Sequence, residues 1–245
     1  MYKSFCIVLL FPFTWCAAQK TVAHKNENWL HAFTSIRLSS KIGITVDAGY
    51  RFKGLFEGTT QTLFRMGGVY YFNNNTFLTV GMAYFNSYPA LNGTKDLVIP
   101  EFRPYQRLFI NSTLGSLQIS HRYRLEERFT RKYINEDLLD EFKYNYRFGY
   151  QLNVQIPLRG KTLEPNELFT VFYDEVFLNF GKQVVTNYFD QNRIFAGLGY
   201  QINKSSFIIA GYQHIWQQTS TPSKFNSIDC ARVVYMYNFD LRKQD

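Results

Sequence analysis

Hydrophobic and polar side chains alternate along much of the chain. The clearest run covers residues 142–156, where every second residue from Phe142 onward is apolar or aromatic and the residues between are polar or glycine. Successive side chains of a β-strand point to opposite faces, whereas a helix would scatter this pattern around its axis. The run therefore predicts a strand with one apolar and one polar face.

Ten further runs show the same period. The predicted strands are residues 29–38, 42–52, 61–72, 76–88, 101–112, 117–129, 142–156, 167–180, 191–202, 205–216 and 228–239. Several exceed the roughly 5 or 6 residues usual in soluble sheets and match the tilted strands of about 9 to 11 residues that cross a membrane. Tight connections alternate with longer polar ones, a pattern typical of barrels with short periplasmic turns and longer extracellular loops.

The number of alternating runs conflicts with the strand numbers of known barrels. Eleven strands with a periplasmic C-terminus would begin the chain outside the cell, and bacterial single-chain barrels have even strand numbers. A short first strand over residues 20–27 would raise the count to twelve, and a miscounted weak run would lower it to ten. We predict twelve strands, with ten as the alternative.

Composition favours a membrane barrel. Phe, Tyr and Trp make up 18% of the residues, yet mean hydropathy is −0.25. Beyond the N-terminal segment, no stretch approaches the roughly 18 consecutive apolar residues of a transmembrane helix. A soluble β-sandwich or lipocalin-like barrel also alternates, but its polar face would be rich in Lys, Glu and Thr rather than Arg, Gln, Asn and Gly. We predict an all-β, closed antiparallel transmembrane barrel.

The first residues have the pattern of a signal peptide. Lys3 precedes an apolar stretch over residues 5–13, and Cys16 and Ala18 supply small side chains for cleavage after Ala18. This predicts export and a single outer-membrane barrel domain over residues 19–245. Lipidation of Cys16 is the alternative, but the preceding Trp15 is too large for it. Removal of residues 1–18 leaves Cys230 as the one cysteine, so no internal disulfide is expected.

Charge and motif content exclude several classes of function. The formal charge of +8 is spread along the chain, with no run of Lys and Arg longer than two residues, so no nucleic-acid partner is expected. No His or Cys spacing typical of a metal site occurs, and the chain has no nucleotide-binding loop. We expect neither a cofactor nor a metal.

Several segments resemble a known family. They are Glu101-Phe-Arg-Pro104, His121-Arg-Tyr-Arg-Leu-Glu-Glu-Arg-Phe129, Glu175-Val-Phe-Leu-Asn179, Phe189-Asp-Gln-Asn-Arg193 and Gly197-Leu-Gly-Tyr200. In this order they resemble a family of Gram-negative outer-membrane β-barrels known only as a domain of unknown function, over most of the chain after residue 18. The resemblance implies the fold and the outer-membrane location, and it brings no activity, substrate or cofactor.

Charged side chains on the polar faces are the candidate functional residues. A barrel of this size has a narrow interior, so inward-facing charges from different strands are expected to meet across it. Asp47, Lys143 and Arg232 lie on the same faces as this set. The predicted lumen network or constriction consists of Arg51, Arg65, Glu101, Arg103, Arg107, Arg122, Arg124, Glu126, Arg128, Arg147, Glu175 and Arg193.

Three functions remain open at this point. The favoured one is a structural or surface-interaction barrel whose lumen is filled by guanidinium forks that bridge carboxylates. The alternative is a small, passive, porin-like channel that prefers anions, because rings of arginine favour anions. The third is a lipid- or peptide-modifying enzyme that uses His121 or His214, although no convincing catalytic constellation supports it. Expected partners are outer-membrane lipid, lipopolysaccharide, the barrel-assembly machinery and small anions.

Overall fold

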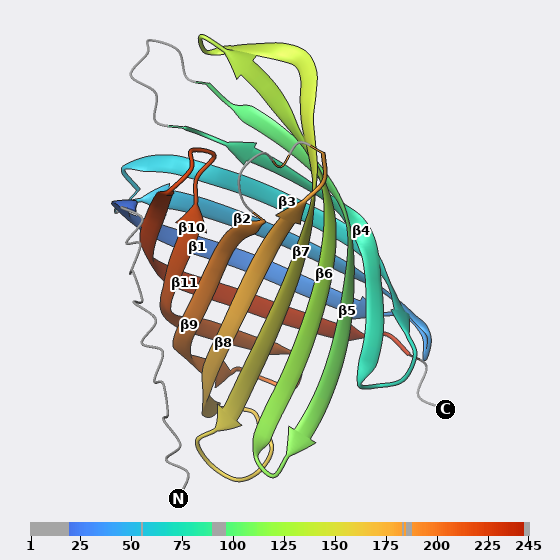
Figure 1. Cartoon of the computed structure of the whole chain (residues 1–245). Coiled ribbons are helices and arrows are strands. Elements are labelled where there is room, and N and C mark those ends of the chain that lie inside the picture. The colour runs from blue at the N-terminus through green and yellow to red at the C-terminus, as the bar shows by residue number, and fades with distance from the viewer. Residues whose placement is uncertain (1–19, 55, 90–96, 183, 185–187, 243–245) are drawn as a thin grey trace, which may run out of the picture.

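The computed structural model describes residues 20–54, 56–89, 97–182, 184 and 188–242, so the predicted signal peptide lies outside the described residues. No helix in this part of the chain is long and apolar enough to cross a membrane. The described chain forms one closed barrel (Figure 1). Its strands are β1 (Thr21–Arg37), β2 (Ile42–Lys53), β3 (Gly58–Tyr71), β4 (Thr76–Ser87), β5 (Ile99–Leu114), β6 (Leu117–Ile134), β7 (Asp137–Pro157), β8 (Glu167–Phe180), β9 (Phe189–Gln201), β10 (Ser206–Gln218) and β11 (Lys224–Asp240).

The prediction of an all-β closed barrel is confirmed, but the barrel has eleven strands rather than twelve or ten. Residues 20–27 do not form a strand of their own, because residues 21–27 are the first part of the continuous strand β1. Each of the eleven alternating runs in the sequence thus corresponds to one strand. The reason given for a twelfth strand, that barrels close with even numbers, does not apply to this chain.

The barrel closes through a parallel pair of strands. Neighbours in sequence pair antiparallel, so an odd number of strands leaves the first and last running in the same direction. β1 and β11 pair in parallel over their whole lengths, from Thr21 opposite Lys224 to Arg37 opposite Asp240. The predicted antiparallel barrel is corrected at this seam, where evenly spaced, slanted hydrogen bonds replace the alternating pairs of an antiparallel ladder.

The two ends of the barrel differ less in loop length than predicted. At the turn end, the connections over residues 38–41, 72–75, 115–116 and 202–205 are tight, and the one over 158–166 is longer. At the opposite, loop end, the connections over residues 88–98 and 181–188 are longer, but those over 54–57 and 219–223 are short.

The connection between the predicted strands 117–129 and 142–156, expected as a longer loop, is instead a hairpin. Strands β6 and β7 extend beyond their neighbours and meet in a tight turn at Asn135 and Glu136, both of which have positive φ (Figure 1). An ion pair of 2.7 Å between Lys132 and Glu141 joins the two arms, so cross-strand charges support the extension.

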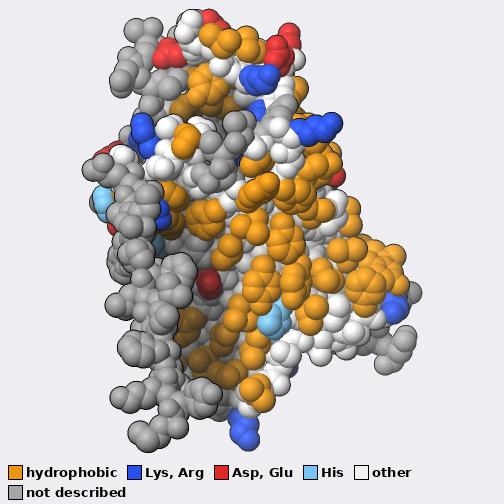
Figure 2. All heavy atoms as spheres, viewed as in Figure 1, with side chains coloured by type: hydrophobic (Ala, Val, Ile, Leu, Met, Phe, Trp, Pro, Cys, Tyr) orange, Lys and Arg blue, Asp and Glu red, His pale blue; other side chains and the backbone are white. Residues whose placement is uncertain are grey.

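Large apolar side chains cover the outside of the barrel. Phe64, Met66, Val80, Met82 and Ile194 each expose half or more of their surface. Figure 2 shows hydrophobic side chains gathered over the middle of one side, whereas most charged side chains lie toward the two ends. Water-soluble monomers rarely expose apolar patches of this extent. The outer surface is therefore suited to contact with hydrocarbon.

Aromatic rings lie on outward positions near both ends of the strands. The loop-end pairs are Tyr84–Phe102 and Tyr146–Phe180, and the turn-end pairs are Tyr70–Phe72 and Tyr237–Phe239. The amphipathic rings of Tyr and Trp prefer the level of lipid headgroups, and girdles of aromatic residues mark both interfaces of membrane barrels. The apolar middle of the surface is thus bounded by rings on each side.

Candidate functional site

The barrel encloses a cavity of about 880 Å³. Its lining extends along β5 from Ile99 to Thr113 and along β6 from Gln118 to Thr130. These residues lie close to the two ends of their strands. The free space therefore follows the barrel from the loop end to the turn end.

The structure brings the predicted charged residues to this cavity. Eleven of the twelve line it, namely Arg51, Arg65, Glu101, Arg103, Arg107, Arg122, Arg124, Arg128, Arg147, Glu175 and Arg193. Glu126 lies behind the lining, where it is 2% exposed and accepts a hydrogen bond from Arg147. Of the further candidates, Asp47 and Arg232 also line the cavity, whereas Lys143 is exposed near the protruding hairpin.

Two guanidinium forks hold Glu101. Arg103 donates through Nε and Nη2 to the two carboxylate oxygens at 2.7 and 2.9 Å, and Arg128 does the same at 2.6 and 3.2 Å. Bidentate, charge-assisted hydrogen bonds of this kind are strong and fix the orientation of both partners. Glu101 and its two arginines therefore form a rigid group on β5 and β6.

Arg147 joins two carboxylates from different strands. Its Nε donates to Glu126 at 2.7 Å and its Nη1 donates to Asp190 at 3.0 Å. Asn179 and Gln191 also donate to Asp190, each at 3.0 Å. The sequence prediction missed Asp190, because it was assigned to the loop before a strand that begins at residue 191. The structure places it in β9, facing the lumen.

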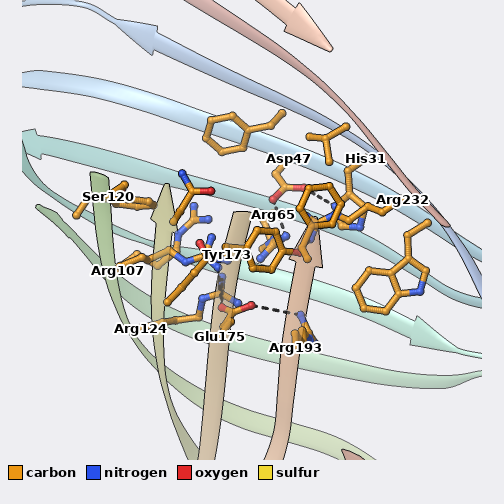
Figure 3. A pocket seen from close by; sticks show the side chains of 18 of the residues that line it. His31, Asp47, Arg65, Arg107, Ser120, Arg124, Tyr173, Glu175, Arg193 and Arg232 are labelled. Carbon is orange, nitrogen blue, oxygen red and sulfur yellow. Dashed lines mark hydrogen bonds and ion pairs between the residues drawn. The ribbon is translucent and has the colours of Figure 1, made fainter. Parts of the chain in front are cut away.

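Glu175 on β8 lies among three arginines from β6 and β9, two of which, Arg124 and Arg193, are labelled in Figure 3. Arg122 donates to its Oε1 at 2.6 Å, and Arg124 Nη2 lies 3.5 Å from the same oxygen. Arg193 Nη1 lies 3.7 Å from Oε2. One carboxylate therefore offsets the charge of three guanidinium groups only in part.

Phe177 forms an aromatic support beneath these charges. The Cζ atoms of Arg147 and Arg193 lie 4.5 and 4.8 Å from the centre of its ring. Phe177 is fully buried because its cross-strand partner is Gly149, where a Cβ atom would lie 2.7 Å from the ring. The missing side chain of Gly149 makes room for the ring, and the ring holds two arginines by cation–π contact.

Three arginines of the cavity have no carboxylate within 4 Å in the described part of the chain. Arg51 stacks on Trp29, with its Cζ 3.6 Å from the ring centre. Arg107 donates to the Tyr105 hydroxyl at 3.1 Å, and Arg232 donates to the Gln213 side-chain oxygen at 2.9 Å. Neutral partners orient these groups without cancelling their charge.

The lumen consequently carries an excess of positive charge. Ten arginines and five carboxylates are among the described residues that line the cavity, and buried Glu126 adds a sixth carboxylate. A guanidinium group keeps its charge in proteins. Hydrogen-bond donors are also in excess, because Arg51, Arg65, Arg107, Arg122, Arg124 and Arg232 each have a buried Nε without an acceptor.

One histidine contact was not foreseen from the sequence. His31 has no carboxylate at a ligand-like spacing along the chain, but its Nδ1 lies 3.8 Å from Asp47 on the neighbouring strand. Asp47 in turn pairs with Arg65 at 2.6 Å. Only the register of β1 against β2 and of β2 against β3 brings these three side chains together.

The two histidines considered for catalysis point away from the lumen. His121 Nδ1 lies 2.9 Å from the Tyr150 hydroxyl, and His214 Nδ1 lies 3.0 Å from a carboxylate oxygen of Asp229, to which Tyr212 also donates. Within the described ranges, no group of three or more His, Cys, Asp and Glu side chains could hold a metal ion. That the chain is not an enzyme stays a prediction.

Most of the chain matches one known family. Residues 26–226 match the family model described as protein of unknown function (DUF2490). The chain belongs to this family. The resemblance to a family of unknown function that we inferred from sequence segments is thereby confirmed, and the DUF2490 match includes all twelve predicted lumen residues.

Comparisons with individual proteins add little. No curated protein matches the sequence. Among solved structures, the chain is similar to the beta domain of the Bordetella autotransporter Brka at 11% sequence identity and a TM-score of 0.42, over 79% of this chain and 93% of that one.

Proposed function

We propose that this DUF2490 protein is a transmembrane β-barrel of the bacterial outer membrane whose lumen admits small anions. The apolar outer surface and the aromatic rings at both strand ends support the membrane location. The signal-peptide pattern over residues 1–18 supports export. Short turns of such barrels face the periplasm and longer loops face the outside, so the turn end is proposed to face the periplasm and the loop end the outside.

The proposed location defines the partners. Lipid hydrocarbon contacts the middle of the outer surface, and lipopolysaccharide contacts the loop end. The barrel-assembly machinery inserts the chain during biogenesis. The aromatic Phe239 near the end of β11 is a candidate for recognition by that machinery.

One observation carries the proposal of an anion pathway: ten arginines face a cavity that follows the barrel from end to end, with only six carboxylates beside them. Low-dielectric walls focus the field of such an excess, which raises the local concentration of anions and repels cations. Arginine and lysine rings give pores a preference for anions for the same reason.

Recording from planar bilayers tests this proposal. With a potassium chloride gradient across the membrane, we expect discrete conductance steps and a reversal potential whose sign indicates chloride preference. The double variant Arg122→Gln/Arg124→Gln should shift the reversal potential toward cations. Arg159→Gln, in the exposed turn between β7 and β8, is the matched control and should leave it unchanged. Unchanged selectivity in the double variant would contradict the proposal.

A closed barrel with a structural or surface-interaction role is the second candidate. Its support is that Arg232 on β11 donates to the hydroxyl of Tyr173 on β8, so side chains meet across the interior (Figure 3). The same recordings separate the two candidates. A closed barrel would show little steady conductance even at high protein density in the bilayer.

A further inference from the structure

The lining of the cavity is divided into a part with charged residues and a part without them, although the Arg37 guanidinium stacks on Tyr71 at the turn end, 4.2 Å from the ring centre. Arg107 on β5 and Arg122 on β6 are the last charged lining residues of their strands toward the turn end. Beyond them, within the described chain, the lining holds apolar, aromatic and neutral polar side chains. We call this turn-end part the vestibule; its apolar lining includes Phe33, Phe77, Phe109, Phe207, Ile209 and Val234.

Arg107 lies at the border between the two parts. It is 3% exposed, its one hydrogen bond in the described structure is to the Tyr105 hydroxyl, and its Nε has no acceptor. Its cross-strand neighbour on one side is Thr79, which is 1% exposed and whose hydroxyl also has no hydrogen-bond partner. A buried guanidinium group whose Nε lacks an acceptor thus lies beside a buried hydroxyl that has no hydrogen-bond partner.

The neighbour of Arg107 on its other side strengthens the positive field. Arg124 lies directly opposite it on β6, and both side chains project from neighbouring strands into the cavity (Figure 3). Arg124 shares its carboxylates with other arginines, since Glu126 also binds Arg147 and Glu175 also binds Arg122. The positive charge at this border is therefore only partly compensated, which favours the binding of an anion.

An aromatic surface begins directly beyond Arg107. Phe109 follows on the same face of β5 and stacks on Phe77 of β4 at a ring-centre distance of 4.7 Å. Tyr71 of β3 continues the row, 5.5 Å from Phe77. A molecule whose charged end reaches Arg107 would lay its adjoining atoms on these rings.

We propose that this border binds an amphipathic anion, with its carboxylate on Arg107 and Thr79 and its apolar body on Phe77 and Phe109 in the vestibule. This inference rests on the proposed function, because it names the class of anion that the lumen takes. Ligand sites typically combine a mostly apolar lining with a few convergent polar groups in roughly 300 to 1,000 Å³. The lining at the border between the charged part and the vestibule has this combination.

The two-part lining also favours an amphipathic anion over simpler ligands. An inorganic anion would satisfy Arg107 but leave the aromatic row in water. An uncharged aromatic compound without an acceptor group would cover the row but leave Arg107 Nε and the Thr79 hydroxyl without a partner, which is unfavourable. Both parts of the site are used only when one molecule carries both groups.

Calorimetric titration of the full mature chain in lipid nanodiscs tests the proposal with three probes. 4-Phenylbutyrate carries the charge and the apolar body, 4-phenylbutyramide keeps the body without the charge, and acetate keeps the charge without the body. We expect 4-phenylbutyrate to bind at least about tenfold more tightly than either of the others. Acetate binding as tight as that of 4-phenylbutyrate would indicate a site for simple anions. Amide binding as tight as that of 4-phenylbutyrate would indicate apolar partitioning. Either result would overturn the proposal.

Two variants locate the site. Arg107→Gln should weaken 4-phenylbutyrate binding by about tenfold or more, because it removes the charged donor. Thr79→Val keeps the shape of the side chain, so it tests the hydroxyl in a barrel that folds even if Arg107→Gln does not, and it should weaken binding by about three- to tenfold. Arg159→Gln is the control and should bind as the parent does. Unchanged affinity in a folded Arg107→Gln or Thr79→Val barrel would overturn the assignment.

The same preparation distinguishes failure of this inference from failure of the proposed channel. Anion-selective conductance without binding of 4-phenylbutyrate would refute the amphipathic site and leave the channel standing. Saturable binding that depends on Arg107, in a barrel without conductance, would refute the channel and leave the site standing.

Discussion

Arg122 on β6 and Glu175 on β8 pair at 2.6 Å across the intervening strand β7. The side chain of Glu175 is almost completely buried, and Arg124 and Arg193 approach the same carboxylate. The contact ties two strands that are not neighbours in the sheet. The negative charge of Glu175 on β8 thus stabilises arginines of both β6 and β9.

Replacement of this carboxylate should destabilise the barrel more than replacement of one of its arginines. Glu175→Gln leaves three guanidinium groups less compensated and should lower the free energy of unfolding by about 3 kcal/mol or more. Arg122→Gln leaves Glu175 with two other arginines and should cost less. Urea unfolding in detergent, followed by tryptophan fluorescence, measures both, with Glu164→Gln in the exposed turn as the control. Equal losses for Glu175→Gln and Arg122→Gln would contradict this reading of the network.

Arg51 offers a charge that can be removed without leaving a carboxylate unpaired. It stacks on Trp29 and has no ion-pair partner in the described structure, so Arg51→Gln should change the free energy of unfolding by no more than about 1 kcal/mol. The same variant should reduce the preference for chloride in bilayer recordings. An Arg51→Gln barrel with the parent's reversal potential would show that this charge lies off the ion path.

The parallel seam can be tested by cross-linking. Leu30 of β1 and Val233 of β11 are paired across the seam. In a Cys230→Ser background, the variant Leu30→Cys/Val233→Cys should form a disulfide under mild oxidation, because paired strand residues lie within disulfide reach. The product is detected by its altered mobility on a denaturing gel.

A second cysteine pair controls for adventitious oxidation. Leu30→Cys/Phe239→Cys separates the two thiols by six residues along β11, or roughly 20 Å, and should stay reduced. Efficient cross-linking of this second pair, or none of the first, would be incompatible with the register of the seam.

The membrane location predicts a penalty for charge on the outer surface. Met82 lies in the middle of β4 and is 55% exposed, so Met82→Arg places a cation where lipid hydrocarbon is proposed to lie. We expect a loss of about 2 to 4 kcal/mol in urea titrations of folding into lipid vesicles. Ser40→Arg, in the turn between β1 and β2, should have little effect. If the two variants fold into vesicles equally well, the outer surface does not face hydrocarbon.

The faces of the strands could be predicted from the sequence because sidedness is a local property. Side chains two positions apart share a face in any strand, so Arg122 and Arg124 had to share one, and Phe142 and Tyr144 another. The alternating runs also gave eleven strands, and only the expectation of an even number changed that count to twelve. Closure into a barrel followed from long strands with one apolar face and aromatic residues on many of them.

The partners of each charge could not be predicted in this way. Asp190 was missed because its strand begins earlier than the pattern suggested, and the contact of His31 with Asp47 joins two residues that are distant along the chain. Lys143 shares the alternation of Arg147 but lies nearer the protruding hairpin, outside the cavity lining. The position of each residue along the barrel axis decides these cases, and the alternation of side chains carries no information about that position.

The sequence by itself determined that the chain forms strands, which side chains face inward and that arginine predominates among the charged ones. The tertiary structure alone decided the parallel closure of β1 on β11, the pairing of Arg122 with Glu175 and the position of Arg107 at the edge of an apolar vestibule. The physical reason is the range of the interactions. Alternation is set by the backbone geometry of adjacent residues, whereas register and contacts across the lumen depend on how all eleven strands tilt and close together.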